Sequence, residues 1–272
     1  MTKQPQPLLA SDSSAAGQSK KRRVICNRCH RPLARACICA ALPDKRITLR
    51  QCHVLAIQHP HEQKRKNRSL FLAELSIENI TRIVTRKFHF DSDNIDADLA
   101  ASLSPERTVW LVYPHEQAKS LRQALADQCC SGETTTSQSK SMNGLDTTPI
   151  TLIFLDATWK FAAEMERASR FPPHTQYVCL DAQEDLVHIE RPMRFDIRTP
   201  PSPSHLSTAE CLALTVSRVE QNPAVYDTIM QPLDLMVAQW HSFMDANSNK
   251  KEQESTQEKN SNVNQQTKGA SL

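Results

Sequence analysis

The chain has 272 residues, of which 39% are hydrophobic, and a formal net charge of +3. This length is sufficient for one sizeable core, and we expect one main domain with an appendage. The first twenty residues lack an uninterrupted apolar segment, which argues against a signal peptide, and the other apolar runs are too short to span a bilayer. We therefore expect a cytoplasmic protein with no membrane segment.

A cysteine cluster follows a polar tail, residues 1–22, that is predicted to be disordered. The segment "CNRCHRPLARACIC" holds four cysteines in two close pairs: Cys26, Cys29, Cys37 and Cys39. Four thiolates suit a tetrahedral zinc site, and because they leave no open position the zinc is expected to be structural. We therefore predict a zinc knuckle over residues 23–45. A catalytic zinc and His30 as a substitute ligand are the alternatives.

Strand and helix patterns alternate behind the knuckle, over residues 46–245. Short β-branched or aromatic runs predict strands at 53–58, 80–85, 108–113, 150–156 and 175–180. Amphipathic and capping patterns predict helices at 69–77, 115–126, 159–169, 207–220 and 233–244. This alternation indicates an α/β domain with a mostly parallel sheet covered by helices on both faces. Polar segments at about 129–148 and 246–272 are predicted to be a disordered insertion and a disordered tail.

The distribution of glycine argues against several nucleotide-binding folds. All four glycines lie in segments predicted to be disordered: Gly17, Gly132, Gly144 and Gly269. A core without glycine contains neither G-x-G-x-x-G nor a Walker loop, because both motifs need backbone that approaches phosphate closely or adopts positive φ. Rossmann dinucleotide enzymes, P-loop NTPases and glycine-rich methyltransferases are therefore disfavoured.

Basic residues are concentrated in short clusters, although the net charge is small. The clusters include "KKRR" at 20–23, "KRKNR" at 64–68 and "TRKF" at 85–88. Such clusters suit a polyanion, most commonly RNA or DNA. For any single cluster, a solvated surface is the alternative interpretation.

The predicted strand at 150–156 ends on an acidic residue, Asp156, directly before a helix. Carboxyl ends of parallel strands are where open α/β sheets usually bind ligands. Asp156 is therefore either a helix N-cap, with Trp159 as a core aromatic, or a carboxylate that accepts a proton in a ligand site. In the second case Thr158 offers a hydroxyl group and Trp159 a stacking face.

Four motifs together resemble the DTW-domain family, which is named for its Asp-x-Thr-Trp motif. They are the cysteine cluster, "QHPHE" at 58–62, "LDATW" at 155–159 and "LSTAE" at 206–210. The resemblance implies a SPOUT-like sheet flanked by helices, with a C-terminal trefoil knot that binds S-adenosylmethionine. It also implies transfer of the 3-amino-3-carboxypropyl group of S-adenosylmethionine to N3 of a uridine in tRNA. The polar insertion and Cys211, where the family pattern has alanine, are departures.

The resemblance also implies roles for individual residues. Asp156 becomes the catalytic residue, as a base or as the group that polarises N3–H, with His59 as the alternative base. The residues expected to bind the cofactor come from the last two motifs and one arginine: Leu155, Thr158, Trp159, Arg198, Leu206, Ser207, Thr208 and Glu210. The residues expected to bind the tRNA substrate follow the first predicted strand: His59, Pro60, Glu62, Arg65, Lys66 and Arg68.

Two other functions are compatible with the same sequence. A SPOUT-type RNA methyltransferase would use the same pocket, because the sequence does not reveal which carbon of the sulfonium faces the nucleophile. A non-catalytic zinc-knuckle RNA-binding protein would keep Asp156 only as a cap. The by-product distinguishes them: methylthioadenosine for aminocarboxypropyl transfer, adenosylhomocysteine for methylation and neither for a binding protein.

Overall fold

The computed structural model describes residues 23–92, 95–131, 149–181, 185, 194–197 and 206–268, with side chains up to residue 248 except those of 130 and 131. Six strands form one sheet: β1 (Cys52–Gln58), β2 (Ile80–Val84), β3 (Val109–Val112), β4 (Lys119–Ser120), β5 (Ile150–Asp156) and β6 (Gln176–Cys179). Their order is β2-β1-β5-β3-β6-β4, and every pairing is parallel. The predicted parallel α/β sheet is confirmed, and each of the five predicted strands corresponds to an observed one.

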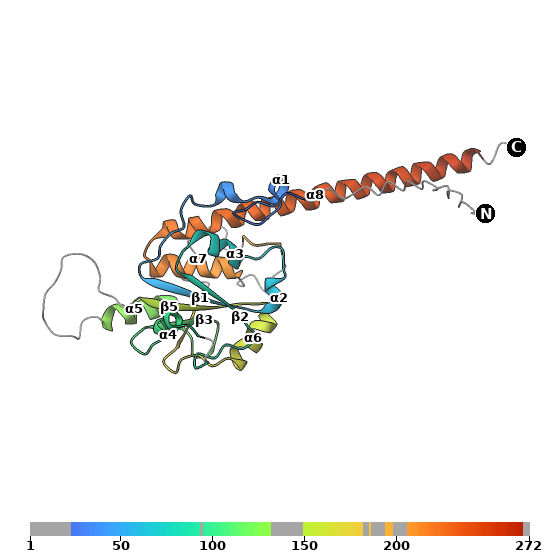
Figure 1. Cartoon of the computed structure of the whole chain (residues 1–272). Helices are drawn as coiled ribbons and strands as arrows, with labels where there is room; N and C mark the ends of the chain where they lie inside the picture. Colours follow the sequence, from blue (N-terminus) through green and yellow to red (C-terminus); the bar gives the residue numbers. More distant parts are fainter. Residues whose placement is uncertain are drawn as a thin grey trace, which may run out of the picture.

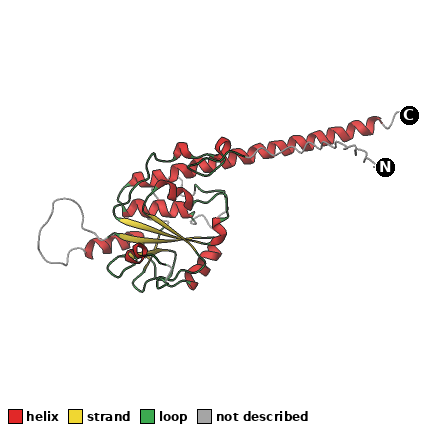
Figure 2. Cartoon of the chain, in the orientation of Figure 1, coloured by secondary structure: helices red, strands yellow, loops and turns green. Residues whose placement is uncertain are grey.

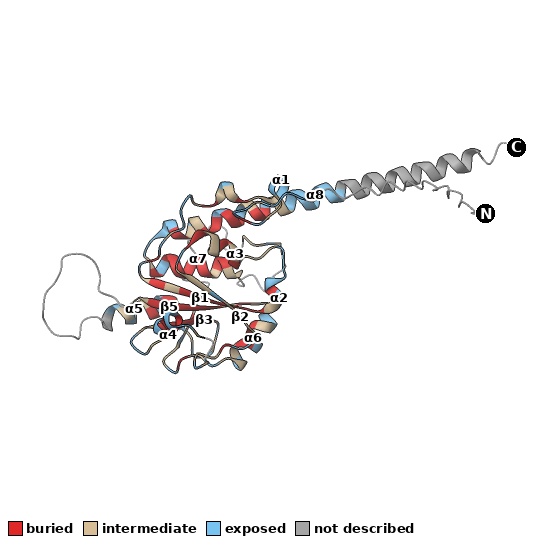
Figure 3. Cartoon of the chain, viewed as in Figure 1, coloured by how far each residue is buried: buried red, intermediate tan, exposed pale blue. Residues whose placement is uncertain are grey.

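The central strands are buried on both faces, which explains their nearly continuous apolar sequences. Along β1, Val54 and Ala56 pack into one hydrophobic core, whereas Leu55 and Ile57 pack into a second core on the opposite face. Figure 3 shows this burial along the strands, and Figure 2 shows the sheet lying between layers of helices. The carboxyl ends of β1 and β5 are adjacent, because Gln58 pairs with Asp156.

Helices cover both faces of the sheet (Figure 1). The first core includes side chains from α3 (Leu70–Ser76), α5 (Leu121–Ser131), α7 (Thr208–Val219) and α8 (Pro223–Lys268). The second includes side chains from α4 (Ala97–Ser102) and α6 (Trp159–Ala168). One short helix, α2 (Pro60–Gln63), follows β1 directly. Among the helices in the described part of the chain, none is long and apolar enough to cross a membrane.

Several helix boundaries differ from the predictions. The helix predicted at 115–126 begins only at Leu121, because Lys119 and Ser120 pair with β6 as a strand too short to produce a period-2 pattern. The short helices that the predictions lack include α2 and α4.

The last helix is much longer than predicted. α8 begins at Pro223, ten residues before the start predicted from the pattern, and continues past Pro232. A proline inside a helix removes one hydrogen bond, so Pro232 weakened the sequence signal at this point. The helix then runs to Lys268, over most of the range predicted to be a disordered tail. This range is rich in Lys, Glu and Gln, which are good helix formers even without an apolar face.

The N-terminal knuckle joins the main core. It contains α1 (Leu33–Ala36) and η1 (Cys39–Ala41), and both contact α8. Ile38 is fully buried in the same core as the sheet, and the Gln239 side chain donates a hydrogen bond of 2.9 Å to the Cys37 carbonyl. Because the knuckle has little core of its own, α8 supplies the surface on which it folds.

Two predictions fall largely on residues that lie outside the described ranges. Most of the polar insertion predicted at about 129–148 belongs to the range 132–148. The predicted trefoil knot depends on the path of residues 182–205, of which only 185 and 194–197 are described. The SPOUT-like class and its knot therefore stay predictions.

Candidate active site

Asp156 lies at the carboxyl end of β5 with only 6% of its surface exposed. Its Oδ2 accepts a hydrogen bond of 2.6 Å from Gln58 Nε2, and its Oδ1 accepts one of 2.7 Å from Thr208 Oγ1. The carboxylate thus joins the end of β1, the end of β5 and the first turn of α7. Both donors are neutral, and no described lysine or arginine forms an ion pair with Asp156.

The helix that follows Asp156 does not use it as a cap. Thr158 is the N-cap residue of α6, and no side chain caps this end of the helix. Trp159 is 41% exposed, so it is not a core aromatic. The interpretation of Asp156 as an N-cap is therefore wrong, and Trp159 lies partly exposed at the start of α6. Leu155 points to the other face of β5 and packs against the second core.

Gln58 is part of this site, although its role was not predicted from the sequence. It is 1% exposed, and its Oε1 accepts a hydrogen bond of 3.1 Å from Arg82 Nη1, while Arg82 also pairs with Glu74. Because the amide oxygen is occupied by Arg82, the amide nitrogen is directed at Asp156. The sequence signal was a polar residue at the end of a buried strand, directly before His59.

The first turn of α7 has the predicted capping residues. Ser207 is the N-cap, and Ser207 and Glu210 form a reciprocal capping box. Glu210 is 2% exposed and also accepts hydrogen bonds from the backbone N–H groups of Arg194 and Phe195. Ser207 and Glu210 therefore stabilise the helix start, whereas Thr208 directs its hydroxyl group to Asp156. Leu206 is half-buried directly before the cap.

The "QHPHE" segment lies beside Asp156. The His59 backbone N–H donates to the Asp156 carbonyl at 2.9 Å, and Pro60 begins α2. His59 is buried; its Nδ1 accepts from the His61 N–H at 3.2 Å, and its ring stacks on Phe161 at 4.4 Å between centroids. Burial, followed by the neighbouring His61 and Arg86, lowers the pKa of His59. These contacts give His59 a packed position next to the site.

Of the other predicted substrate-binding residues, Glu62 lies within α2, and Arg65, Lys66 and Arg68 follow it. Glu62 is buried and forms an ion pair of 3.0 Å with Arg65, so this pair fixes the start of the basic cluster. Lys66 is exposed, and the Arg68 guanidinium lies over the Phe71 ring at 5.1 Å. Arg198 lies outside the described residues.

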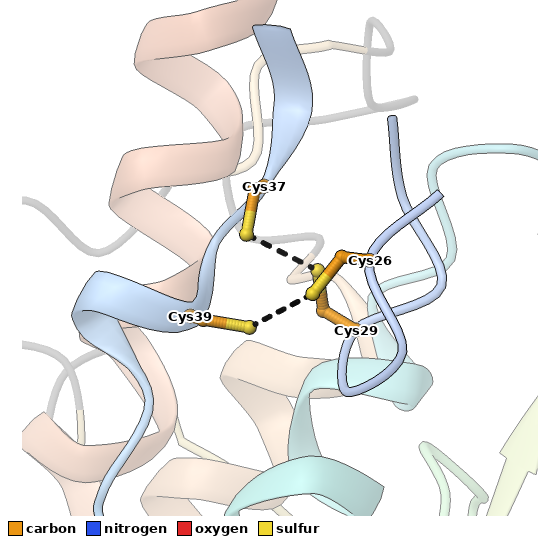
Figure 4. A group of neighbouring side chains, drawn as sticks. All are labelled: Cys26, Cys29, Cys37 and Cys39. Carbon is orange, nitrogen blue, oxygen red and sulfur yellow. Dashed lines mark hydrogen bonds between the residues drawn. The ribbon is translucent and has the colours of Figure 1, made fainter. Parts of the chain in front are cut away.

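The four cysteines converge at a single point (Figure 4). Their Sγ atoms all lie within 4.8 Å of one another, with 3.4 Å between Cys26 and Cys39 and 3.8 Å between Cys29 and Cys37. Backbone N–H groups of Cys29 and Arg28 lower the pKa of the Cys26 thiol to about 6, which favours the thiolate that a metal requires. The cluster fits a four-thiolate zinc site, and among the described residues His30 is not part of it.

Comparisons with known proteins agree with these motifs. A mouse protein named tRNA-uridine aminocarboxypropyltransferase 2 is 28% identical over 224 residues, which cover 79% of this chain and 63% of the mouse protein. An Arabidopsis thaliana protein named tRNA-uridine aminocarboxypropyltransferase A is 30% identical over 212 residues, or 73% of this chain and 74% of that protein. A Drosophila melanogaster protein named tRNA-uridine aminocarboxypropyltransferase 2 is 27% identical over 212 residues, which cover 78% of this chain and 73% of the Drosophila protein.

The chain therefore spans less than two thirds of the length of the mouse relative. No solved structure matches it. The model of the DTW domain matches residues 23–241, from before the cysteine cluster, through Asp156 and α7, into α8. With a match over most of its length, the chain belongs to the DTW domain family.

Proposed function

We propose that this protein modifies tRNA by transferring a 3-amino-3-carboxypropyl group from S-adenosylmethionine to N3 of a uridine. The observation that carries the proposal is the buried Asp156 carboxylate, held by Gln58 and Thr208 at the carboxyl edge of the sheet. The names of the relatives from mouse, Arabidopsis and Drosophila support the same reaction. A cytoplasmic location remains part of the proposal.

The residues around Asp156 fit a cationic donor. S-adenosylmethionine supplies an electrophilic carbon next to a sulfonium and releases methylthioadenosine. A buried carboxylate that is bonded only to neutral described groups leaves a negative charge available for a ligand cation. In this proposal Thr158 and the first turn of α7, with Ser207 and Thr208, hold the amino-acid end of the donor. The partly exposed Trp159 offers a stacking face.

Asp156 is proposed to act on the uridine as well as on the donor. N3 carries a proton that must leave as the bond from N3 to the donor carbon forms and the carbon–sulfur bond breaks. Each Asp156 oxygen uses one lone pair for its protein donor and retains another. In this proposal the carboxylate accepts the N3 proton on a remaining lone pair while Gln58 and Thr208 keep it in place.

The remaining predicted residues would position the RNA. Lys66 and Arg68 lie on the surface after α2, where contacts to phosphate would orient the tRNA without reading its bases. We propose that zinc occupies the four-cysteine site and fixes the knuckle against α8. A SPOUT-like arrangement with a knotted donor-binding loop is part of the same proposal.

The by-product of the reaction tests this function. The full chain is incubated with S-adenosylmethionine and a pool of unmodified tRNA transcripts, and both adenosine products and digested nucleosides are analysed by mass spectrometry. Methylthioadenosine together with an aminocarboxypropyl-uridine is the expected result. Adenosylhomocysteine would instead indicate a methyltransferase. Binding of tRNA without either product would indicate a non-catalytic RNA-binding protein.

A further inference from the structure

A small pocket lies beside Asp156, between α2, α6 and the turn that follows β2. Its volume is about 260 Å³, and the lining residues that matter for its chemistry are His59, His61, Arg86, Lys87, Phe161 and Glu164. Its two basic side chains, Arg86 and Lys87, belong to "TRKF" at 85–88, a basic cluster to which the proposed reaction assigns no role. The pocket is therefore a separate feature that requires its own explanation.

The pocket is adjacent to the candidate active site through backbone contacts. His59 donates its N–H to the Asp156 carbonyl at 2.9 Å, and Thr85 donates its N–H to the Gln58 carbonyl at 3.0 Å. Phe161 belongs to the first turn of α6, which begins three residues after Asp156. The walls of the pocket thus start from the same strand ends that position the carboxylate, and a substrate that contacts both would lie along one edge of the sheet.

The turn that carries the two cations is held on both sides. Thr85 Oγ1 donates to the Lys87 carbonyl at 2.8 Å and accepts from the Lys87 N–H at 3.2 Å. Phe88 is buried; its N–H donates to Ser169 Oγ at 2.9 Å, and its carbonyl accepts from the Arg170 N–H at 2.7 Å. Because the backbone is fixed, Arg86 and Lys87 project from a position that is ordered before any ligand binds.

The opposite wall consists of packed rings. His59 and Phe161 stack with an interplanar angle of 5°, and His61 meets both rings edge-on, with centroids 4.8 Å and 5.2 Å away. His61 is exposed, whereas His59 is buried beneath it. A polar imidazole on a rigid aromatic support can donate a hydrogen bond to an anion that enters between it and the turn.

The charges in the pocket favour an anion. Arg86 and Lys87 are both exposed. Neither is a member of an ion pair between described side chains. Arg86 is close enough to His59 to contribute to its lowered pKa. Glu164 is the acidic residue among those that line the pocket, so the two cations outnumber it. Arginine and lysine side chains with unused donors are the usual partners of phosphate oxygens.

We propose that this pocket binds a backbone phosphate of the substrate RNA, next to the nucleotide whose base reaches Asp156. Arg86 and Lys87 supply the positive charge, His61 supplies a further donor, and the turn at 85–88 sets their spacing. The contact positions the RNA and does not select its sequence. This inference rests on the proposed function, because it takes RNA as the substrate.

Binding of labelled tRNA tests the pocket without requiring turnover. The affinity of the full chain for fluorescently labelled, unmodified tRNA transcripts is measured by anisotropy over a series of salt concentrations. In the double variant Arg86→Ala/Lys87→Ala, we expect binding about tenfold weaker and a plot of log K against log salt that is less steep by about one to two units. The value of kcat/KM for methylthioadenosine release should fall to a similar extent.

Two further variants control for indirect effects. Arg50→Ala removes an exposed arginine two residues before β1, near the amino end of that strand, and should leave affinity and salt dependence unchanged. Glu164→Gln removes the opposing charge from the pocket and should strengthen tRNA binding by about twofold to threefold. Wild-type affinity and salt slope in the double variant, with wild-type thermal stability, would overturn the proposal. Weaker binding in Glu164→Gln would also contradict it.

The two proposals fail in distinguishable ways. If the wild type binds tRNA, releases no methylthioadenosine, and the double variant binds weakly, the phosphate pocket is supported and the transfer reaction is not. If the wild type releases methylthioadenosine and the double variant binds tRNA with the affinity and salt dependence of the wild type, the reaction is supported and the pocket is refuted. If the wild type does not bind tRNA, the pocket proposal is refuted together with its premise.

Discussion

Gln58 and Asp156 are direct partners in the parallel pairing of β1 and β5, and the Gln58 side chain donates a hydrogen bond of 2.6 Å to Asp156 Oδ2. The register of the two strands thus brings the Gln58 amide of "QHPHE" against the Asp156 carboxylate of "LDATW". Arg82 holds the amide oxygen of Gln58, so the donor end cannot turn away without breaking that bond. A residue outside the predicted site therefore fixes the orientation of the predicted catalytic group.

Replacement of Asp156 by asparagine should separate proton transfer from structure. In Asp156→Asn the side-chain oxygen can still accept from Gln58, while its amide group donates to the Thr208 hydroxyl, which can accept as well as donate. We expect a loss of about 1 kcal/mol in the free energy of unfolding. We expect methylthioadenosine release to fall by roughly two to four orders of magnitude, the usual contribution of a general base.

Asp127→Asn is a matched control, because Asp127 forms a surface ion pair of 2.6 Å with Lys119 away from the site. It should retain wild-type turnover. If Asp156→Asn also modified tRNA at the wild-type rate, Asp156 would have no role in proton transfer.

Substitution of Gln58 should change the behaviour of Asp156 through orientation and charge. Gln58→Met keeps the length of the side chain but removes the donor, and we expect turnover about tenfold lower from the less well-oriented carboxylate. Gln58→Glu replaces the donor with a second carboxylate against Asp156, so repulsion between like charges should displace the catalytic group and lower turnover further. Wild-type rates in both variants would show that Gln58 does not position Asp156.

The cysteine cluster predicts one zinc ion per chain, measurable by elemental analysis of the purified protein. Cys26→Ser removes one ligand from a closed site and should lose most of the zinc, with a lower Tm because the knuckle packs on α8 through Ile38 and Gln239. Cys129→Ser, at an exposed cysteine outside the cluster, should keep the full zinc content. A wild-type protein without zinc would refute the metal site.

Acid should destabilise the protein through His59. Burial, with His61 and Arg86 nearby, lowers the pKa of His59, whereas Glu62 and Glu164 oppose the shift. Between the ordinary pKa of about 6.5 and the lower pKa in the folded state, the unfolded chain binds more protons than the folded chain. The contribution of His59 to stability is therefore complete above pH 6.5 and is lost as pH falls through the folded-state pKa.

Thermal unfolding at several pH values below 7 measures this effect. The decrease in Tm on acidification should be smaller in His59→Gln than in the wild type. Some decrease in Tm should remain in His59→Gln, because burial, with Arg107 nearby, also lowers the pKa of His53. The contribution of His53 to stability is therefore also lost as the pH falls. An equal decrease in both proteins would show that His59 is not linked to stability in this range.

Local patterns in the sequence were sufficient for much of the architecture. The central strands were predictable because burial on both faces requires continuous apolar runs, and β1, β3 and β5 have them. The start of α7 was predictable because Ser207 and Glu210 satisfy backbone groups within one turn. The convergence of the four cysteines was predictable because two close pairs can meet without help from distant residues.

The remaining features depend on contacts between distant segments. Asp156 accepts hydrogen bonds from Gln58 and Thr208, which are 98 and 52 positions away in the chain. These bonds form because β1 lies beside β5 and α7 begins near the carboxyl ends of both strands. Hydrophobic periodicity specifies which face of a strand is buried, but it contains no information on which strands are neighbours. The sequence by itself determined that an acidic residue ends a buried strand. The tertiary structure decided that this residue is a buried carboxylate that accepts two hydrogen bonds and is not a helix cap, because only packing brings Gln58 and Thr208 to its two oxygens.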